Sequence, residues 1–226
     1  MSIELPQNSQ QWIFDQTKPG WDQYFMAMVF LVAMRSPDQE TKQGCVIVDW
    51  PSKTVMATGY NGHPRNAVPY CDQGNGPIYH PNDIKQDVAF VEHAIPTTRP
   101  DKYPFMVHAD TNAVANVQGT SDHAVVYLPM PPCEVCLGVM ANMSRVRIRR
   151  IVYLEHRHFP RTEQLARHLP HIKFEQYLGP DPTELLSRAA MYTAIRQAHG
   201  KELSRESVAT YADSLGGNEG KEQRAA

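Results

Sequence analysis

Two short motifs carrying side chains typical of zinc sites constrain the fold of this chain more than any other feature. The first is His-Ala-Asp at His108–Asp110, and the second is Pro-Cys-Glu-Val-Cys at Pro132–Cys136. One imidazole and two thiolates supply three zinc ligands and leave the fourth tetrahedral position open, which is typical of a catalytic site. The fold must therefore bring two motifs that are far apart in sequence to one point.

The two motifs stand at the predicted starts of two helices. The helix macrodipole stabilises negative charge there, which helps to keep Cys133 and Cys136 as thiolates. Their Cys-x-x-Cys spacing lets both sulfurs reach one ion from the first turn of a helix. Asp110 follows His108 by two residues, so its carboxylate lies near the metal, where a proton shuttle is needed, without having to be a ligand. We therefore predict that His108, Cys133 and Cys136 bind a catalytic Zn²⁺ and that Asp110 is the catalytic acid and base.

Two other functions of the cysteine pair are open at this point. A thioredoxin-like redox pair has the same spacing, but it needs no His-x-Asp motif upstream. Half of a structural four-ligand site would require a fourth Cys or His at a matched spacing, and none is obvious near residue 108. A catalytic zinc site therefore accounts for more of the sequence than either alternative.

The order of the predicted elements indicates an α/β fold. Helices are predicted over Trp21–Met34, His108–Val117, Cys133–Met143, Thr162–Leu169 and Pro182–His199. Strands are predicted over Cys45–Val48, Thr54–Thr58, Ala124–Leu128, Val146–Val152 and Ile172–Tyr177. Because strands alternate with helices, the elements predict an α/β sandwich with a mostly parallel or mixed sheet.

The chain has 226 residues, which suits one domain with appendages. We predict this domain over residues 20–178, with an irregular insert at about 61–104 where prolines and glycines are dense. Residues 179–226 are expected to form a C-terminal helix and a disordered tail.

The insert contains a second group of possible metal ligands. Cys71, His80 and His93, with His63 nearby, could bind a structural zinc that orders the insert. Their spacings fit no tight motif, so a free cysteine with surface histidines is the alternative.

Composition argues against several classes of partner. The formal net charge is −2, so no overall positive field attracts nucleic acid or an anionic membrane. The longest apolar run, Tyr24–Met34, is too short to span a bilayer, and no basic, apolar secretory signal opens the chain. Arginines at positions 145, 147, 149 and 150 could contact a triphosphate or a nucleic acid, but they alternate with apolar residues as on the solvated face of a strand. We expect a cytoplasmic protein with a small-molecule ligand, without a membrane or nucleic-acid partner.

The two motifs resemble those of a known enzyme superfamily. His-x-Glu followed by Pro-Cys-x-x-Cys is the signature of the zinc-dependent cytidine deaminases. Within that superfamily the chain is most similar to the deoxycytidylate (dCMP) deaminases, over roughly Trp21 to Tyr153. The similarity extends to Trp21–Met26, Arg35-Ser36, Gly44–Val48, Gly59–Gly62 followed by Pro64, and His108–Ala113.

The resemblance implies a fold and a reaction. The fold is a three-layer α/β/α sandwich of the cytidine deaminase type with a mixed central sheet. The reaction is hydrolytic deamination at C4 of cytosine, which converts dCMP into dUMP and ammonia. Asp110 would take a proton from water and deliver it to N3 and to the leaving amine.

The resemblance also implies substrate contacts. The backbone N–H of Ala109 would meet the base O2, the carbonyl of Pro129 would meet the exocyclic amine, and Asn61 would touch a nucleotide sugar. Tyr153 ends a predicted strand, and it could either lie over the base or be a core aromatic residue.

Regulation and assembly follow from the same resemblance. Deoxycytidylate deaminases are typically homo-oligomers, often hexamers. They are activated by dCTP with Mg²⁺ and inhibited by dTTP. We therefore expect a homo-oligomer, with a hexamer favoured, and these nucleotides as effectors.

Asp110 departs from the family pattern, which has Glu at this position. Aspartate is shorter by one methylene, about 1.5 Å of reach, and a displacement of about 1 Å can cost around a hundredfold in rate. The backbone could compensate and leave an active enzyme, or the substrate could be dCTP or a modified cytosine nucleotide. A nucleotide-binding pseudo-deaminase is the third alternative. We favour activity because the carboxylate is retained.

Overall fold

A computed structural model of the chain describes residues 18–38, 40–64, 71–72, 76–77 and 99–199. The chain divides into two compact units. One consists of Phe25–Gly179, and the other combines Met1–Tyr24 with Pro180–Ala226. Both zinc motifs belong to the first unit.

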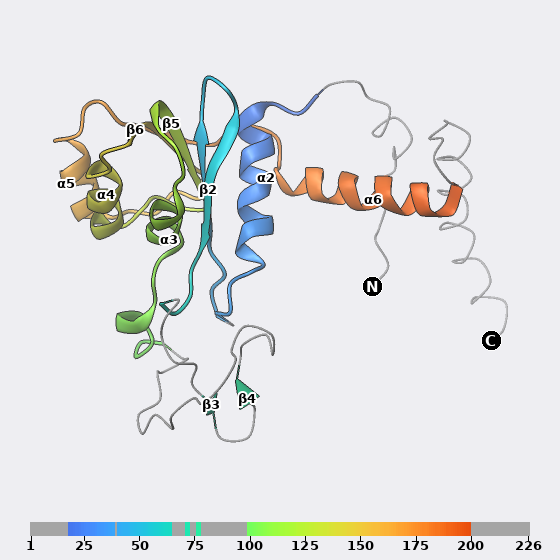
Figure 1. Cartoon of the computed structure of the whole chain (residues 1–226), viewed down its shortest axis with the longest axis horizontal. Coiled ribbons are helices and arrows are strands. Elements are labelled where there is room, and N and C mark those ends of the chain that lie inside the picture. The colour runs from blue at the N-terminus through green and yellow to red at the C-terminus, as the bar shows by residue number, and fades with distance from the viewer. Residues whose placement is uncertain (1–17, 39, 65–70, 73–75, 78–98, 200–226) are drawn as a thin grey trace. The chain divides into compact units, whose positions relative to one another are not determined.

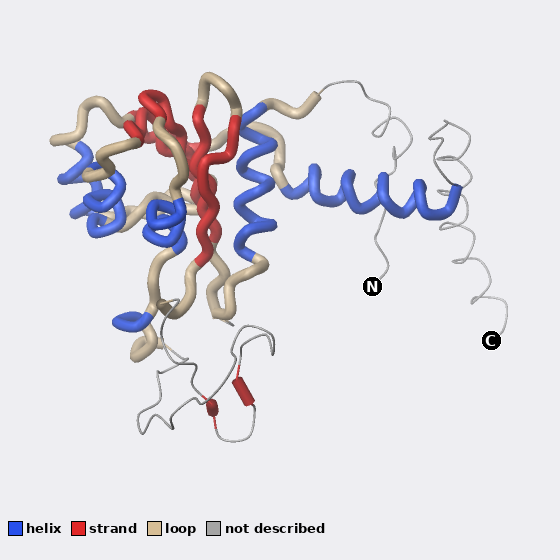
Figure 2. The backbone as a smooth tube through the Cα atoms, viewed as in Figure 1, coloured by secondary structure: helices blue, strands red, loops and turns tan. Residues whose placement is uncertain are grey.

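A five-stranded mixed sheet forms the centre of the Phe25–Gly179 unit, in the strand order β2-β1-β5-β6-β7 (Figure 2). The strands are β1 (Gly44–Asp49), β2 (Thr54–Tyr60), β5 (Ser121–Leu128), β6 (Val146–Tyr153) and β7 (Lys173–Gln176). Strand β1 runs antiparallel to β2 and β5, whereas β5, β6 and β7 are parallel. The predicted mixed sheet is therefore confirmed.

Helix α2 (Trp21–Ala33) covers one face of this sheet. Phe25, Met26 and Val29 pack there against every second residue of the central strands, such as Val46 and Val48. Alternate strand residues point to opposite faces, so one apolar run in β1 supplies both layers of the core. Burial on both faces explains why the run reads as continuously hydrophobic in the sequence.

The opposite face is covered by α3 (Ala109–Asn116), α4 (Glu134–Ala141) and α5 (Pro160–Ala166), as Figure 1 shows. Ala113 of α3 and Leu137 of α4 are fully buried against Cys45, Ile47 and their neighbours. Helices thus lie on both faces, and the three-layer α/β/α sandwich is confirmed. Helix α5 begins at Pro160 rather than at the predicted Thr162, because proline suits the first turn, where its missing N–H costs nothing.

Strand β2 lies at an edge of the sheet and is partly exposed, whereas β1, its neighbour, is buried over almost its whole length. The carbonyls of Thr58 and Tyr60 accept hydrogen bonds from the side chains of Asn116 and Asn112, at 3.0 and 2.8 Å. The carbonyl of Met56 accepts one from the backbone N–H of Gln118 at 3.4 Å. Helix α3 and the residues after it therefore satisfy a row of carbonyls along this edge.

Within the insert the described elements are short. Strands β3 (Cys71–Asp72) and β4 (Gly76–Pro77) pair antiparallel, and a 3₁₀ turn, η1, spans Tyr103–Phe105. His80 and His93 lie outside the described residues, as does the side chain of Cys71, so the second zinc site stays a hypothesis.

The second unit contains helix α6 (Thr183–His199). The carboxylate of Asp181 accepts hydrogen bonds from the backbone N–H and the hydroxyl of Thr183, at 2.8 and 2.7 Å, as a helix-capping aspartate does. No helix among the described residues is long and apolar enough to cross a membrane.

Two glycines allow helix backbones to touch the sheet. A Cβ added at Gly59 would lie 2.2 Å from the carbonyl oxygen of Ala109 and 2.3 Å from the nitrogen of Ala113, both in α3. A Cβ at Gly44 would lie 2.1 Å from the carbonyl oxygen of Val29 in α2, on the other face. Any side chain at these positions would push a helix away from the sheet.

We expect Gly59→Ala to lower the free energy of unfolding by at least about 1–3 kcal/mol, the usual cost of overpacking. It should also reduce bound zinc, because the displaced helix follows directly after His108. Gly44→Ala should destabilise the fold similarly while zinc is retained, since it displaces α2 instead. Urea unfolding and metal analysis of purified proteins measure both effects.

Gly138→Ala is the control for this pair. A Cβ at Gly138 meets nothing within 4 Å, so alanine should stabilise α4 by up to about 1 kcal/mol. If Gly59→Ala unfolded at the wild-type urea concentration and kept its zinc, the close contact between β2 and α3 would not control the site.

Candidate functional site

Three potential metal ligands converge where α3 and α4 begin. The Nδ1 atom of His108 and the Sγ atoms of Cys133 and Cys136 all lie within 4.8 Å of one another. The two sulfurs are 3.3 Å apart, and His108 Nδ1 is 3.3 Å from Cys136 Sγ and 3.6 Å from Cys133 Sγ. Ligands of a tetrahedral zinc are about 3.5–3.8 Å apart, given its bond lengths of about 2.0–2.3 Å. The donor set therefore fits Zn²⁺, and each of the three atom pairs lies within about 0.5 Å of the spacing in a tetrahedral site.

Helix geometry explains why these side chains can serve as ligands. His108 is the N-cap residue of α3 and Cys133 is the N-cap residue of α4, both with extended backbone. Neither side chain makes a capping hydrogen bond to its own helix. Both therefore remain directed at the shared point, as the prediction of ligands at two helix starts requires.

The charge on the cysteines is also suited to a cation. The hydrogen bond from Cys136 is the main reason that the pKa of Cys133 is lowered to about 4, and a hydrogen bond with His108 adds to the effect. The pKa of Cys136 is raised because it donates to that thiolate. The hydrogen bond to Cys133 raises the pKa of His108. Zinc binding would release the remaining protons from these groups.

Asp110 lies beside the metal site but is not part of the triangle of ligand atoms. Its side chain is buried with 5% of its surface exposed, and its Oδ1 accepts a hydrogen bond from the backbone N–H of Thr111 at 3.0 Å. Burial raises the pKa of Asp110 above that of an ordinary carboxyl, although a hydrogen bond with Cys136 opposes the shift. A buried carboxyl of this kind is suited to exchanging protons with a bound substrate.

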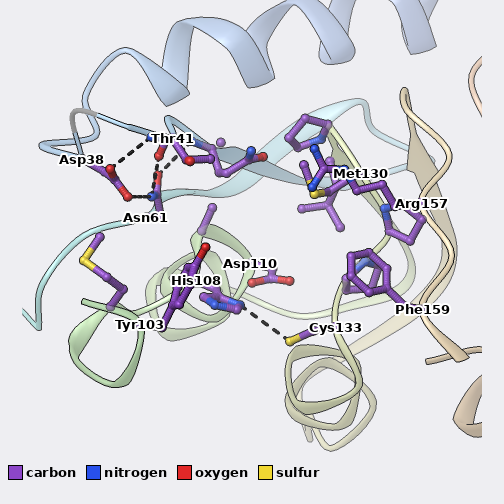
Figure 3. A pocket seen from close by; sticks show the side chains of 18 of the residues that line it. Asp38, Thr41, Asn61, Tyr103, His108, Asp110, Met130, Cys133, Arg157 and Phe159 are labelled. Atoms are coloured by element: carbon purple, nitrogen blue, oxygen red, sulfur yellow. Dashed lines mark hydrogen bonds between the residues drawn. The ribbon is translucent and has the colours of Figure 1, made fainter. Parts of the chain in front are cut away.

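A pocket of about 270 Å³ opens onto this site (Figure 3). Asp110, His108 and Cys133 form one part of its wall. The rest comes from the segment after β5, from the loops around Asn61 and Lys102, and from Arg157 and Phe159. The cavity approaches the size of small-ligand sites, which begins at about 300 Å³.

Asn61 lies in the pocket wall, but the protein itself uses its side-chain amide. Its Oδ1 accepts a hydrogen bond from the backbone N–H of Gln43 at 2.8 Å, and its Nδ2 donates to the carbonyl of Thr41 at 2.8 Å and to Asp38 at 3.2 Å. Asn61 therefore shapes the loop between α2 and β1. The predicted contact with a nucleotide sugar stays a prediction.

Lys102 was not found from the sequence, yet it anchors the same wall. Its side chain is 2% exposed, and its Nζ lies 2.7 and 2.9 Å from the two carboxylate oxygens of Asp38 and 2.7 Å from Glu40. Burial alone would raise the pKa of Asp38, but the hydrogen bond from Lys102 and two backbone N–H groups hold it below the usual value. Nothing in the spacing of these residues indicates that they meet, because the partners Asp38 and Lys102 lie 64 residues apart.

The other three residues predicted to contact the substrate line two different cavities. Ala109 and Pro129 line the pocket. The carbonyl of Pro129 already accepts a hydrogen bond from the backbone N–H of Glu155 at 2.8 Å, which leaves one lone pair for a ligand. Tyr153 lies instead in the wall of a second cavity of about 330 Å³, beside His156 at a ring distance of 6.1 Å. Pro131, Arg157 and Phe159 line both cavities.

The basic cluster lies along β6, away from these cavities. Arg147 pairs with Asp122 at 3.5 Å, Arg149 donates to the carbonyl of Asp122 at 3.0 Å, and Arg150 pairs with Glu175 at 2.6 Å. These contacts support the interpretation of the cluster as the solvated part of a strand.

Comparisons with known proteins agree with the chemistry of the site. The family profile described as "Cytidine and deoxycytidylate deaminase zinc-binding region" matches residues 19–155. The chain is 33% identical over 135 residues to a probable deoxycytidylate deaminase of Drosophila melanogaster, which covers 59% of each chain. It is 27% identical over 150 residues to the human deoxycytidylate deaminase, covering 66% of this chain and 72% of the human one.

A relative from Schizosaccharomyces pombe, a deoxycytidylate deaminase, is 30% identical over 138 residues but is covered over only 37% of its length. The chain thus spans about a third to three quarters of these relatives. The crystal structure of a dCMP deaminase from the cyanophage S-TIM5 has a TM-score of 0.48 and 18% identity, over 71% of this chain and 100% of that chain. Since the family profile matches more than half of its residues, this chain belongs to the cytidine and deoxycytidylate deaminase zinc-binding family.

Proposed function

We propose that this protein hydrolyses dCMP to dUMP and ammonia. One observation carries the proposal: a His-Cys-Cys triangle of zinc-binding size lies beside a buried carboxyl at the wall of a small pocket. A redox function of the cysteine pair would not require His108 at 3.3 Å from Cys136.

The residues of the site suggest how the reaction proceeds. His108, Cys133 and Cys136 would hold the Zn²⁺, which when bound would lower the pKa of a water ligand to about 7 and so supply a nucleophile at neutral pH. Asp110 accepts a proton from the attacking water and passes it to N3 of the base. After the oxygen has bonded to C4, Asp110 takes the remaining proton of the new hydroxyl and delivers it to the amine. The C4–N4 bond then breaks, ammonia leaves, and the oxygen stays on C4 as a carbonyl.

Binding of the base requires groups that recognise its edge. In this proposal the backbone N–H of Ala109, which lies in the first turn of α3 and in the pocket wall, donates to O2. The second lone pair of the Pro129 carbonyl, also in the pocket wall, accepts from the exocyclic amine. Both groups are on the backbone, so their positions depend on α3 and on the end of β5 rather than on side-chain rotamers.

The choice of dCMP as substrate is supported by the relatives, which carry the name deoxycytidylate deaminase at 27–33% identity. On the same resemblance we propose assembly into a hexamer, activation by dCTP with Mg²⁺ and inhibition by dTTP.

A nucleotide-binding protein without activity is the second candidate. Asp110 in place of the usual glutamate favours it, since the shorter side chain reaches about 1.5 Å less far. Against it, the carboxyl is retained and buried beside the ligands, where a protein that only binds nucleotide would have no use for it.

We expect close to one zinc ion per chain, and we expect Cys133→Ala to lose it together with activity. The free energy of unfolding should also fall, because the metal joins the first turns of α3 and α4. Metal analysis and thermal unfolding measure these effects. Cys45→Ala is the matched control, since Cys45 is a buried thiol outside the triangle and its loss should leave zinc in place. Full zinc occupancy in Cys133→Ala would show that the ligand assignment is wrong.

We expect Asp110→Asn to lower the turnover of dCMP by about 10²–10⁴ while zinc remains bound, because an amide cannot accept and return a proton. Asp110→Glu tests whether the reach of the side chain limits the reaction. If it does, the rate should rise by about tenfold or more. If the pocket has closed around aspartate, the longer side chain should clash and the rate should fall. Asp122→Asn, at an exposed carboxylate, is the control. Wild-type turnover by Asp110→Asn would exclude this mechanism.

A further inference from the structure

Away from the zinc site, the charged residues that the structure describes in the pocket wall are a neutral group around Lys102 and one arginine, Arg157, outside that group. On one side, Lys102 lies between the carboxylates of Asp38 and Glu40, and Arg99 is 3.6 Å from Glu40. Two cations and two anions thus neutralise one another, and Lys102 is too deeply buried to turn toward a ligand. This side of the pocket offers no net charge to an anionic substrate.

Arg157 differs from Lys102 and Arg99 in that no acidic partner neutralises it among the described residues. Within the described part of the chain its guanidinium forms no ion pair and no hydrogen bond with another residue, although it lines the pocket. Figure 3 shows Arg157 on the far side of the pocket from Asp38 and Asn61, with its side chain directed inward past Met130. An arginine has five N–H donors in a planar fork that fits two oxygens of a phosphate, and all of them are available here.

The loop that carries Arg157 is fixed to the segment that leads to the zinc ligands. At its start, the backbone N–H of Glu155 donates to the carbonyl of Pro129 at 2.8 Å. At its end, the hydroxyl of Thr162 donates to the carbonyl of Pro132, the residue before Cys133, at 2.9 Å and in a buried position. Because both ends are held by the same short segment, the distance from Arg157 to Asp110 and to the ligands is set by the fold.

We propose that Arg157 binds the 5′-phosphate of the nucleotide and makes the pocket selective for nucleotides over nucleosides. This inference rests on the proposed function for the identity of the substrate, but phosphate binding can be tested without turnover. A charge-assisted contact contributes about a tenfold to hundredfold preference for the phosphorylated ligand. The phosphate would lie at the boundary of the two cavities, since Arg157 lines both.

The kinetic test compares dCMP with deoxycytidine, which lacks only the phosphate. We expect Arg157→Ala to lower kcat/KM for dCMP by about tenfold to a hundredfold, mostly through KM, and to leave deoxycytidine within about twofold of wild type. For Arg157→Lys we expect a kcat/KM for dCMP between those of wild type and Arg157→Ala, because lysine keeps the charge without the bidentate geometry. Arg161→Ala is the matched control, since Arg161 is an exposed neighbour that pairs with Glu134 at 3.5 Å and lines neither cavity. Equal losses for dCMP and deoxycytidine would overturn the proposal.

The binding test uses dUMP and deoxyuridine with the zinc-loaded protein in a calorimeter. Wild type should bind dUMP more tightly than deoxyuridine, and Arg157→Ala should lose that preference while keeping its affinity for deoxyuridine. An unchanged preference in the variant, or none in wild type, would contradict the assignment of Arg157. If wild type turned over no cytosine nucleotide, the proposed function would fail, and the dUMP preference would still decide the role of Arg157.

Discussion

Direct contact between helix α3 and strand β2 holds the site in place. The contact is possible because Gly59 has no side chain, and the asparagines of α3 add hydrogen bonds to the strand on the same side. His108 directly precedes this helix, Ala109 begins it and Asp110 follows. The position of the imidazole, of one backbone donor and of the carboxyl therefore depends on how closely one helix approaches one strand. Helix α4 brings Cys133 and Cys136 to the same point from the end of β5.

The parts of the site that depend on short sequence spacing could be predicted. Cys133 and Cys136 are neighbours on one helical turn wherever the helix lies, and the Pro-Cys pattern marks where it starts. The alternation of strands and helices indicated an α/β sandwich for a similar reason. The spacing of apolar residues and the residues that form turns are both read from neighbouring positions in the sequence. The order of the strands, with β2 at the edge, depends on pairing between distant segments and could not be derived in this way.

The residues that sequence reasoning missed owe their roles to distant partners. Lys102 is buried only because Asp38 and Glu40 surround it, and neither has a spacing that would indicate contact. A buried ion pair of this kind costs desolvation and gives little net stability, so its effect is mainly to fix one arrangement of the loop. Asn61 illustrates the converse case. Its place in a glycine-rich turn suggested a ligand contact, whereas the structure gives its amide three partners within the protein.

The row of occupied carbonyls along β2 has a consequence for self-association. An edge strand usually exposes backbone groups that can pair with a strand of another molecule, which leads to continuous sheets and aggregation. Here the carbonyls of Thr58 and Tyr60 accept hydrogen bonds from α3, and that of Met56 accepts one from Gln118, two residues beyond the end of α3. At the opposite edge, β7 is only four residues long and carries the charged side chains of Lys173 and Glu175. Copies of this chain that assemble would therefore join through helices and loops rather than by extending the sheet.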